Sequence, residues 1–241
     1  MNERRIGSVP RSLRILLPTL LAAQLIFSLL QPRPQARADQ LSPPPPLALA
    51  RVMSVGEPIA FAQMMTLYLQ AFDNQPGISI PFAALDYNTV SAWLERILDL
   101  DPKGQYPLMM ASQLYAEVPD ENKQRRMFDL VYREFLRDPD RRWPWLAHVA
   151  IMAKHRLKDL PLALHYAQAI STYATGTHVP HWARQMQIFL HEDMGELETA
   201  KVLLGGLLDG GIVTDPHEIH FLIEQLNRLS TADKSSSPSG N

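Results

Sequence analysis

The sequence predicts an all-α protein in which antiparallel helical hairpins stack into a short array. Residues 143–208 contain four consecutive helical patterns separated by short breaks, and each pattern carries one narrow apolar stripe. A helix with a single stripe cannot bury it alone, whereas two stacked hairpins bury all four. Helix starts that share a role also recur at Tyr106, Trp143 and Trp182, at spacings of 37 and 39 residues. Periods of this size are typical of helical-pair arrays.

The first predicted hairpin covers residues 58–101. Pro58 suits the first turn of a helix, and the stripe expected to face the core consists of Ala60, Met64, Leu67, Tyr68 and Ala71. Two prolines and a glycine within residues 74–82 end this helix. A second helix is expected after Asp86 and before Asp101-Pro102. Its core-facing stripe consists of Val90, Trp93, Leu94, Ile97 and Leu98.

The following residues continue the pattern of paired helices. Residues 106–116 and 121–136 form the next predicted pair, and the two hairpins within residues 143–208 follow. Gly205 and Gly206 interrupt the last of these helices. Because each Gly costs about 1 kcal/mol relative to Ala in a helix interior, this pair predicts the close approach of a neighbouring helix.

A one-sided terminal helix is expected after residue 214. Asp215, Pro216 and Glu218 have the spacing of a capping box with Pro in the first turn. A polar outer face suits the end of an array, and its expected members are Glu218, Glu224, Gln225 and Arg228. The repeat domain is thus predicted to span residues 58–229, and residues 230–241 form a disordered tail.

Composition excludes several classes of function. The chain has 241 residues, of which 46% are hydrophobic, which is enough for one elongated domain with a full core. It contains no cysteine. Disulfides, thiol nucleophiles and cysteine-based metal sites are therefore excluded.

The net charge of −2 hides an asymmetry between the start of the chain and its body. Residues 1–38 hold six arginines and one acid, so the remaining 17 basic and 24 acidic residues give the body a charge of −7. Nucleic-acid phosphates demand a cationic surface. We therefore expect no nucleic-acid partner.

Residues 1–38 have the pattern of a membrane-targeting segment. Four arginines precede the apolar run of residues 15–30, and Ala36-Arg37-Ala38 offers a small-x-small cleavage site. A cleaved signal peptide and an uncleaved signal anchor both fit this pattern. In either case the arginines hold the N-terminus on the cytoplasmic side and send the body across the membrane. The predicted location is the inner membrane, as a single-pass protein with its body in the periplasm, or alternatively secretion to the periplasm.

Residues 39–57 are interpreted as a Pro-rich tether. The proline run of residues 43–46, preceded by Pro32 and Pro34, favours extended polyproline II backbone. Such a segment acts as a semi-rigid spacer between a membrane and a folded body.

The repeats resemble those of the tetratricopeptide repeat family. Gly195, Ala200 and Leu207 are spaced much like the turn and second helix of that repeat, and residues 162–170 and 97–102 look like a second helix and a repeat end. The spacing exceeds the family's 34 residues, and the first helices lack its W-x-x-L-G-x-x-Y run. The resemblance implies a right-handed superhelix whose first helices line a concave groove for a peptide or partner protein. It implies no catalytic chemistry.

No residue pattern points to catalysis, a cofactor or a metal. The phosphate-binding Gly loop and G-x-S-x-G are absent, and His191 lacks the second histidine of H-E-x-x-H. His217 and His220 could supply two metal ligands, but a third and a fourth are missing. The chain is therefore predicted not to be an enzyme.

Two features are candidate partner-binding sites. Arg126, Arg133 and Arg137 share one helix face and could bind an acidic partner or lipid headgroups, although interleaved acids at helical spacing favour a solvated face of ion pairs. Periodic tryptophans are more often core residues than ligand platforms. Trp143 precedes Pro144 and lies outside the stripe of its helix, so it is the candidate surface anchor.

These observations favour a non-catalytic, membrane-tethered adaptor outside the cytoplasm that binds a partner protein or peptide in an envelope assembly. An exported binding protein released by signal cleavage is the first alternative. A glycan-acting helical-repeat enzyme is the second, and it would require two acids that converge in a dry cleft.

Overall fold

The computed structural model describes residues 11–30, 39–75, 77–209 and 215–236. The chain divides into two compact units, one made of Met1–Asp39 with Pro76–Ile78 and the other of Gln40–Gln75 with Ser79–Asn241. The two units are described separately below. The expected cleavage site at residues 36–38 lies outside the described residues.

The first unit contains helix α1 (Arg11–Leu30), which includes the apolar run of the predicted targeting segment and has Pro18 in its interior. Among the residues that the structure describes, no helix combines the length and apolarity needed to cross a membrane.

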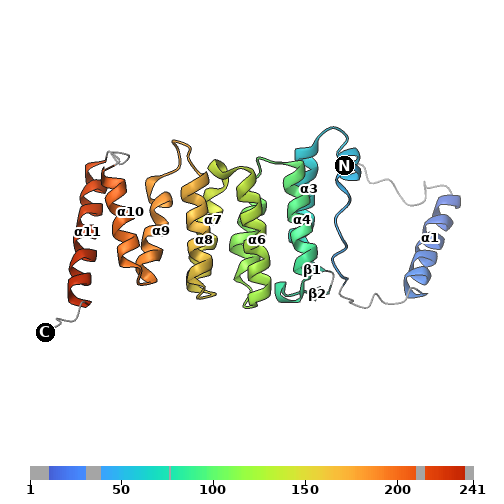
Figure 1. Cartoon of the computed structure of the whole chain (residues 1–241). Coiled ribbons are helices and arrows are strands. Elements are labelled where there is room, and N and C mark those ends of the chain that lie inside the picture. Colours follow the sequence, from blue (N-terminus) through green and yellow to red (C-terminus); the bar gives the residue numbers. More distant parts are fainter. Residues whose placement is uncertain (1–10, 31–38, 76, 210–214, 237–241) are drawn as a thin grey trace, which may run out of the picture. The chain divides into compact units, whose positions relative to one another are not determined.

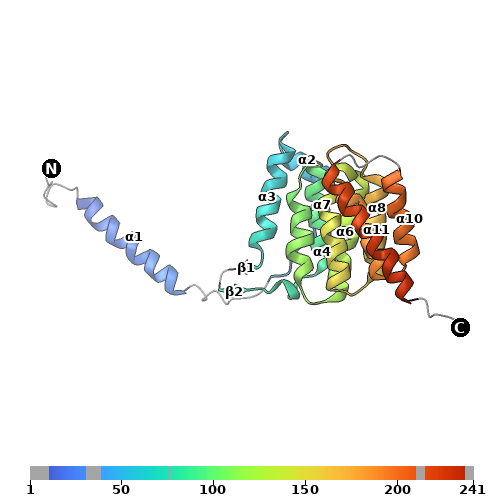
Figure 2. The same cartoon turned by 90° about the vertical axis from the view of Figure 1, so that its left-hand side faces the viewer.

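The second unit is an all-α array of helices that stand side by side in chain order (Figures 1 and 2). Its α-helices are α2 (Leu47–Met53), α3 (Pro58–Ala71), α4 (Tyr87–Leu100), α5 (Tyr106–Met109), α6 (Glu121–Arg137), α7 (Pro139–His155), α8 (Leu160–Tyr173), α9 (His181–Asp193), α10 (Leu197–Asp209) and α11 (Pro216–Ser236). Its short elements are β1 (Asn74–Gln75), the 3₁₀ turns η2 (Phe82–Ala84) and η4 (Tyr115–Glu117), and the π-helical turn η3 (Met110–Leu114). The strand β2 (Ile78–Ser79) lies at the boundary of the two units in the sequence. The predicted all-α class is confirmed.

Aspartates fix the starts of several helices at the places that the sequence predicts. Asp86 accepts hydrogen bonds from the backbone of Asn88 and Thr89 and so begins α4. Asp120 and Asp159 cap α6 and α8 in the same way. A side-chain cap satisfies amide groups that have no partner inside the helix.

Part of the predicted tether packs on the array. Leu41 is buried, and the Trp93 indole Nε1 donates a hydrogen bond to the Ser42 carbonyl at 2.7 Å. Helix α2 follows directly and buries Ala50. The prolines at 43–46 cannot donate backbone hydrogen bonds, and the segment attaches to α4 through an acceptor, the Ser42 carbonyl.

The core-facing stripe predicted for α3 is wrong. The structure buries the opposite face, made of Phe61, Ala62, Met65, Thr66 and Leu69. Met64, Leu67 and Tyr68 are exposed by 57%, 65% and 49%. Between Glu57 and Asp73 the sequence has no charged residue. Apolar periodicity cannot select a face on a helix that is apolar all round.

The helix predicted at residues 106–116 is irregular. Helix α5 gives way after one turn to the π-turn η3 and then to η4. Such changes in hydrogen-bond register alter which side chains face the core. Here Leu108, Met110, Ala111 and Tyr115 are all buried.

A buried ion pair joins α6 and α7. Arg142 Nη1 lies 2.6 Å from Glu134 Oε2, and both side chains are at most 4% exposed. Arg142 also donates to the backbone carbonyls of Glu134 and Pro102 at 2.6 and 2.8 Å. Through Pro102, the same guanidinium holds the turn that follows α4.

The apolar core is divided between a large and a small cluster. The large cluster runs from Leu41 to Leu190. The small one contains Ile188, Ala200, Leu204, Leu222 and Leu229. Helix α9 contributes to both clusters.

The C-terminal helix is longer than predicted. Asp215 caps it by accepting from the His217 amide at 2.8 Å. The helix continues to Ser236, so the first residues of the predicted disordered tail are helical. The sequence offers no helix breaker before Pro238.

The glycines in α10 do not mark a close helix approach. A Cβ added to Gly205 or Gly206 would meet no atom within 4 Å. We therefore expect Gly205→Ala to stabilise the protein by up to about 1 kcal/mol, because alanine lowers the entropy cost of an interior helix position. Urea denaturation checks this prediction, with Gly195→Ala as the contrast. Gly195 has φ +77°, where a Cβ is unfavourable, so that variant should be less stable than wild type.

Candidate functional site

The first helices of the array each contribute a large apolar residue at a regular interval. Leu67 (α3), Tyr106 (α5), Trp143 (α7), Trp182 (α9) and Phe221 (α11) follow one another at 39, 37, 39 and 39 residues. Four of the five are at least 45% exposed, and Trp143 is half-buried. Leu67 and Tyr106 line one pocket, Trp182 and Phe221 line another, and the Trp143 and Trp182 rings are in contact. We call these five residues the apolar row.

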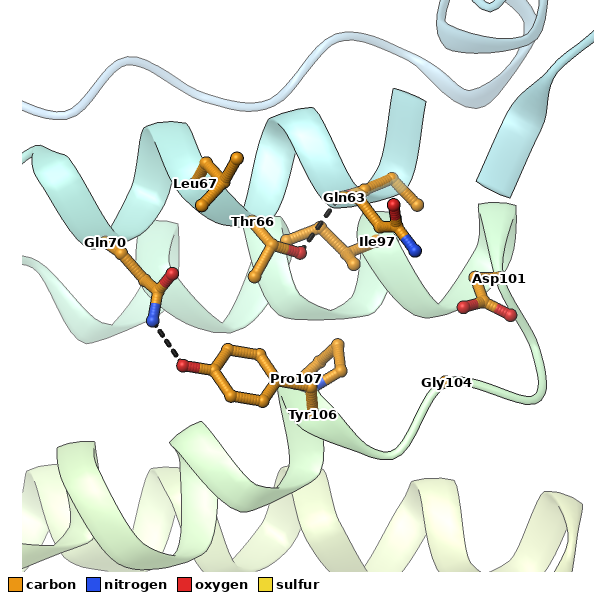
Figure 3. Close-up of a pocket in the computed structure, with 10 residues that line it drawn as sticks. Gln63, Thr66, Leu67, Gln70, Ile97, Asp101, Gly104, Tyr106 and Pro107 are labelled. Carbon is orange, nitrogen blue, oxygen red and sulfur yellow. Dashed lines mark hydrogen bonds between the residues drawn. The ribbon is translucent and has the colours of Figure 1, made fainter. Parts of the chain in front are cut away.

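One end of the row opens into a pocket between α3, α4 and α5, with a volume of about 490 Å³ (Figure 3). Leu67 and Tyr106 belong to its wall, together with Ile97 and Pro107. The Gln70 amide donates a hydrogen bond to the Tyr106 hydroxyl across the pocket. This bond ties the first helices of two neighbouring pairs together.

Asp101 supplies the charge of this α3–α5 pocket. It is the residue that ends α4, and Figure 3 shows it at the end of the pocket away from Gln70. The Gly104 amide donates to the Asp101 carbonyl at 3.0 Å. A Cβ on Gly104 would lie 2.9 Å from Asp101 Oδ2, so glycine is needed to keep the carboxylate in this position.

The other end of the row has a second pocket, between α9 and α11, with a volume of about 500 Å³. Trp182, Phe189 and Phe221 form its aromatic wall. The Phe189 and Phe221 rings lie 6.3 Å apart. Gln185 Nε2 donates to Glu218 Oε1 at 2.8 Å, so this α9–α11 pocket also combines aromatic rings, an amide and one carboxylate.

Glu218 therefore has a different role from the predicted one. The capping-box pattern predicts that its side chain returns to the start of α11. The structure instead turns it towards Gln185 on α9. A bond to a neighbouring helix cannot be inferred from spacing within α11.

Trp143 lies inside the row, but it is not the exposed anchor that the sequence suggests. Its side chain packs against the large core cluster, and its ring meets the Trp182 ring edge-on at 5.4 Å. Trp182 is 53% exposed. The tryptophan surface available to a partner is thus mainly that of Trp182, with Trp143 behind it.

The basic run forms a face of ion pairs, as its interleaved acids suggest. Arg133 pairs with Asp129 on its own helix at 3.0 Å and with Glu95 on α4 at 2.7 Å. Arg137 pairs with Glu134 at 2.8 Å and with Asp99 on α4 at 3.2 Å. These contacts fasten α6 to α4, so these two guanidinium groups are already neutralised within the chain.

Arg126 lies on the same surface and borders a shallow polar depression together with Glu95, Asp129 and Arg133. Its side chain is exposed and forms no ion pair within the described part of the chain. Because Glu95 and Asp129 lie beside it, this single unpaired guanidinium would attract an acidic partner only weakly.

The described residues contain no group of three or more metal-ligating side chains. The carboxylates of Asp101 and Glu218 line different pockets. They do not form a pair of the kind that glycoside hydrolysis uses.

Comparisons with protein-family models, with curated proteins and with solved structures find no match for this chain.

Proposed function

We propose that this protein is a non-catalytic adaptor that binds a segment of a partner protein along the apolar row. The observation that carries the proposal is the regular spacing of large apolar side chains on successive first helices, four of which are at least 45% exposed. Monomeric proteins rarely expose contiguous apolar surface without a use for it.

The shape of the surface also supports a protein ligand. Pockets of about 490 and 500 Å³ at the two ends of the row are large enough for side chains of an extended or helical segment. Trp182 is the expected anchor, because tryptophans in such settings contribute much of the binding energy.

We further propose that the array is of the tetratricopeptide type and that the protein works outside the cytoplasm. Export is supported by the arginine-rich start and by the apolar run within α1. The N-terminal segment would act as a cleaved signal peptide or as a membrane anchor. The N-terminal mass of the protein isolated from its native cells distinguishes these two forms.

Site-specific photo-crosslinking tests the adaptor function. A benzophenone amino acid replaces Trp182 or Tyr106 in the full chain, and Val202 in the control. Val202 is 71% exposed but lies on α10, a second helix. We expect positions 182 and 106 to crosslink the same defined protein in native cells and position 202 not to do so. Equal yields at all three positions, or no adduct at the row, would contradict the proposal.

A further inference from the structure

We propose that the segment bound along the apolar row is cationic as well as apolar, with lysine or arginine side chains next to large apolar ones. This inference rests on the proposed function and specifies its ligand. It follows from the charges that border the pockets and from their contrast with the rest of the surface.

The α3–α5 pocket carries a negative charge that no cationic side chain among the described residues neutralises. Asp101 is the charged residue in its lining, which otherwise consists of apolar, amide and hydroxyl side chains. Among the described residues, Asp101 has no cationic partner within ion-pair distance. A positive group on the ligand would meet this carboxylate at the edge of an apolar wall, where the local dielectric constant is below that of water.

The α9–α11 pocket likewise places a carboxylate beside an apolar wall. One carboxylate oxygen of Glu218 accepts a hydrogen bond from the neutral Gln185 amide, and the side chain has no arginine or lysine partner in the described part of the chain. A histidine, His181, is the basic side chain of the lining. The exposed Trp182 ring offers a face for a cation, since ammonium and guanidinium groups are attracted to aromatic faces.

Three arginines elsewhere on the array, by contrast, have acidic partners within the chain. Arg125, Arg133 and Arg137 each contact two acids. The protein thus neutralises these cations internally while leaving a carboxylate open in each pocket. An acidic ligand would place like charges together in a partly desolvated pocket, which costs several kcal/mol at an interface.

The negative charge of the whole body also favours a cationic ligand. Residues 39–241 carry a charge of −7, and a field of one sign speeds the approach of an oppositely charged ligand. An anionic bilayer surface fits less well, because the same charge repels it and the lining of these pockets is concave. The ligand chemistry is therefore that of a basic, apolar peptide segment.

Three fluorescent peptides test the inference. They share one pattern of leucine and tryptophan and differ at the intervening positions, which are all lysine, all glutamine or all glutamate. Binding to the full-length protein is measured by anisotropy at low and high salt. We expect the lysine peptide to bind best and to weaken as salt screens the charges. We expect the glutamate peptide to bind worst.

Two variants that each remove one negative charge test whether Asp101 and Glu218 cause the preference for the lysine peptide. Asp101→Asn and Glu218→Gln keep the shape of each side chain, and each should weaken the lysine peptide by about tenfold, the size typical of a hydrogen bond to a charged group. Neither should change binding of the glutamine peptide. Glu198→Gln is the matched control, since Glu198 is exposed on α10 and pairs with Lys201; it should leave all three affinities unchanged.

The outcomes separate the ligand chemistry from the docking surface. If the lysine and glutamine peptides bind equally and both weaken in Trp182→Ala, the row binds peptides but the cationic preference is wrong. If the glutamate peptide binds best, the inference is reversed. If Trp182→Ala leaves all three affinities unchanged and the crosslinks at positions 182 and 106 are absent, the proposed function itself fails.

Discussion

Replacing Glu134 by alanine should lower the free energy of unfolding by about 3–5 kcal/mol, the usual cost of leaving one charge of a buried ion pair without its partner. The Arg142 guanidinium would remain 3% exposed, and its closest anion would be gone. Arg142→Ala should cost a similar amount for the same reason. Urea denaturation, followed by circular dichroism, measures both changes.

The control for this prediction removes both charges together. Glu134→Leu combined with Arg142→Met keeps similar volumes and leaves no buried charge, so the double variant should be much more stable than either single alanine variant. The Pro102 carbonyl would lose its donor, so full recovery is not expected. Single variants that lose less than about 1 kcal/mol would mean that the pair is solvated in solution.

Trp93→Ala is expected to have an effect of comparable size. Trp93 is 8% exposed, stacks with Tyr68 at 5.1 Å and holds the Ser42 carbonyl through its indole. Truncating a buried tryptophan to alanine costs about 3–5 kcal/mol through lost contacts and the cavity that remains. The same change should release residues 40–46 from α4, which limited proteolysis detects as faster cleavage beside Leu41, a residue that is buried in the wild-type protein.

Trp93→Phe separates packing from the hydrogen bond. Phenylalanine retains an aromatic ring beside Tyr68 but cannot donate to Ser42. We expect a smaller loss of stability, with the hydrogen bond accounting for about 1 kcal/mol of it, together with the same release of residues 40–42. If cleavage in this segment is unchanged in both variants, the indole does not hold it.

The sequence predicts a helix well where polar and apolar residues alternate at helical spacing. The stripe of α4 is buried as predicted, because its other face carries residues such as Glu95 and Arg96. Helix α3 has no such contrast, and its buried face could be chosen only by its contact with α4. The local hydrogen-bond shift in η3 has no signature in the residues themselves.

The candidate site was only partly accessible to sequence analysis. The spacing of Tyr106, Trp143 and Trp182 is visible in the sequence, and extending it by 39 residues in each direction reaches Leu67 and Phe221. The pockets depend on contacts such as Gln185 to Glu218, which join residues 33 positions apart. Likewise, the local pair of Arg133 with Asp129 is predictable from helical spacing, but its bond to Glu95 requires the packing of α6 on α4.

Because the core is divided into two clusters, a bound ligand should change the stability of the C-terminal end more than that of the rest of the array. The small cluster holds α10 and α11 to α9 with few buried residues, so this end should open locally at a lower free energy than the rest. The α9–α11 pocket is assembled only while that end is closed. A ligand in it therefore stabilises the closed form in proportion to its affinity and concentration, and occupancy should slow amide exchange in α10 and α11 while leaving α4, α6 and α8 unchanged.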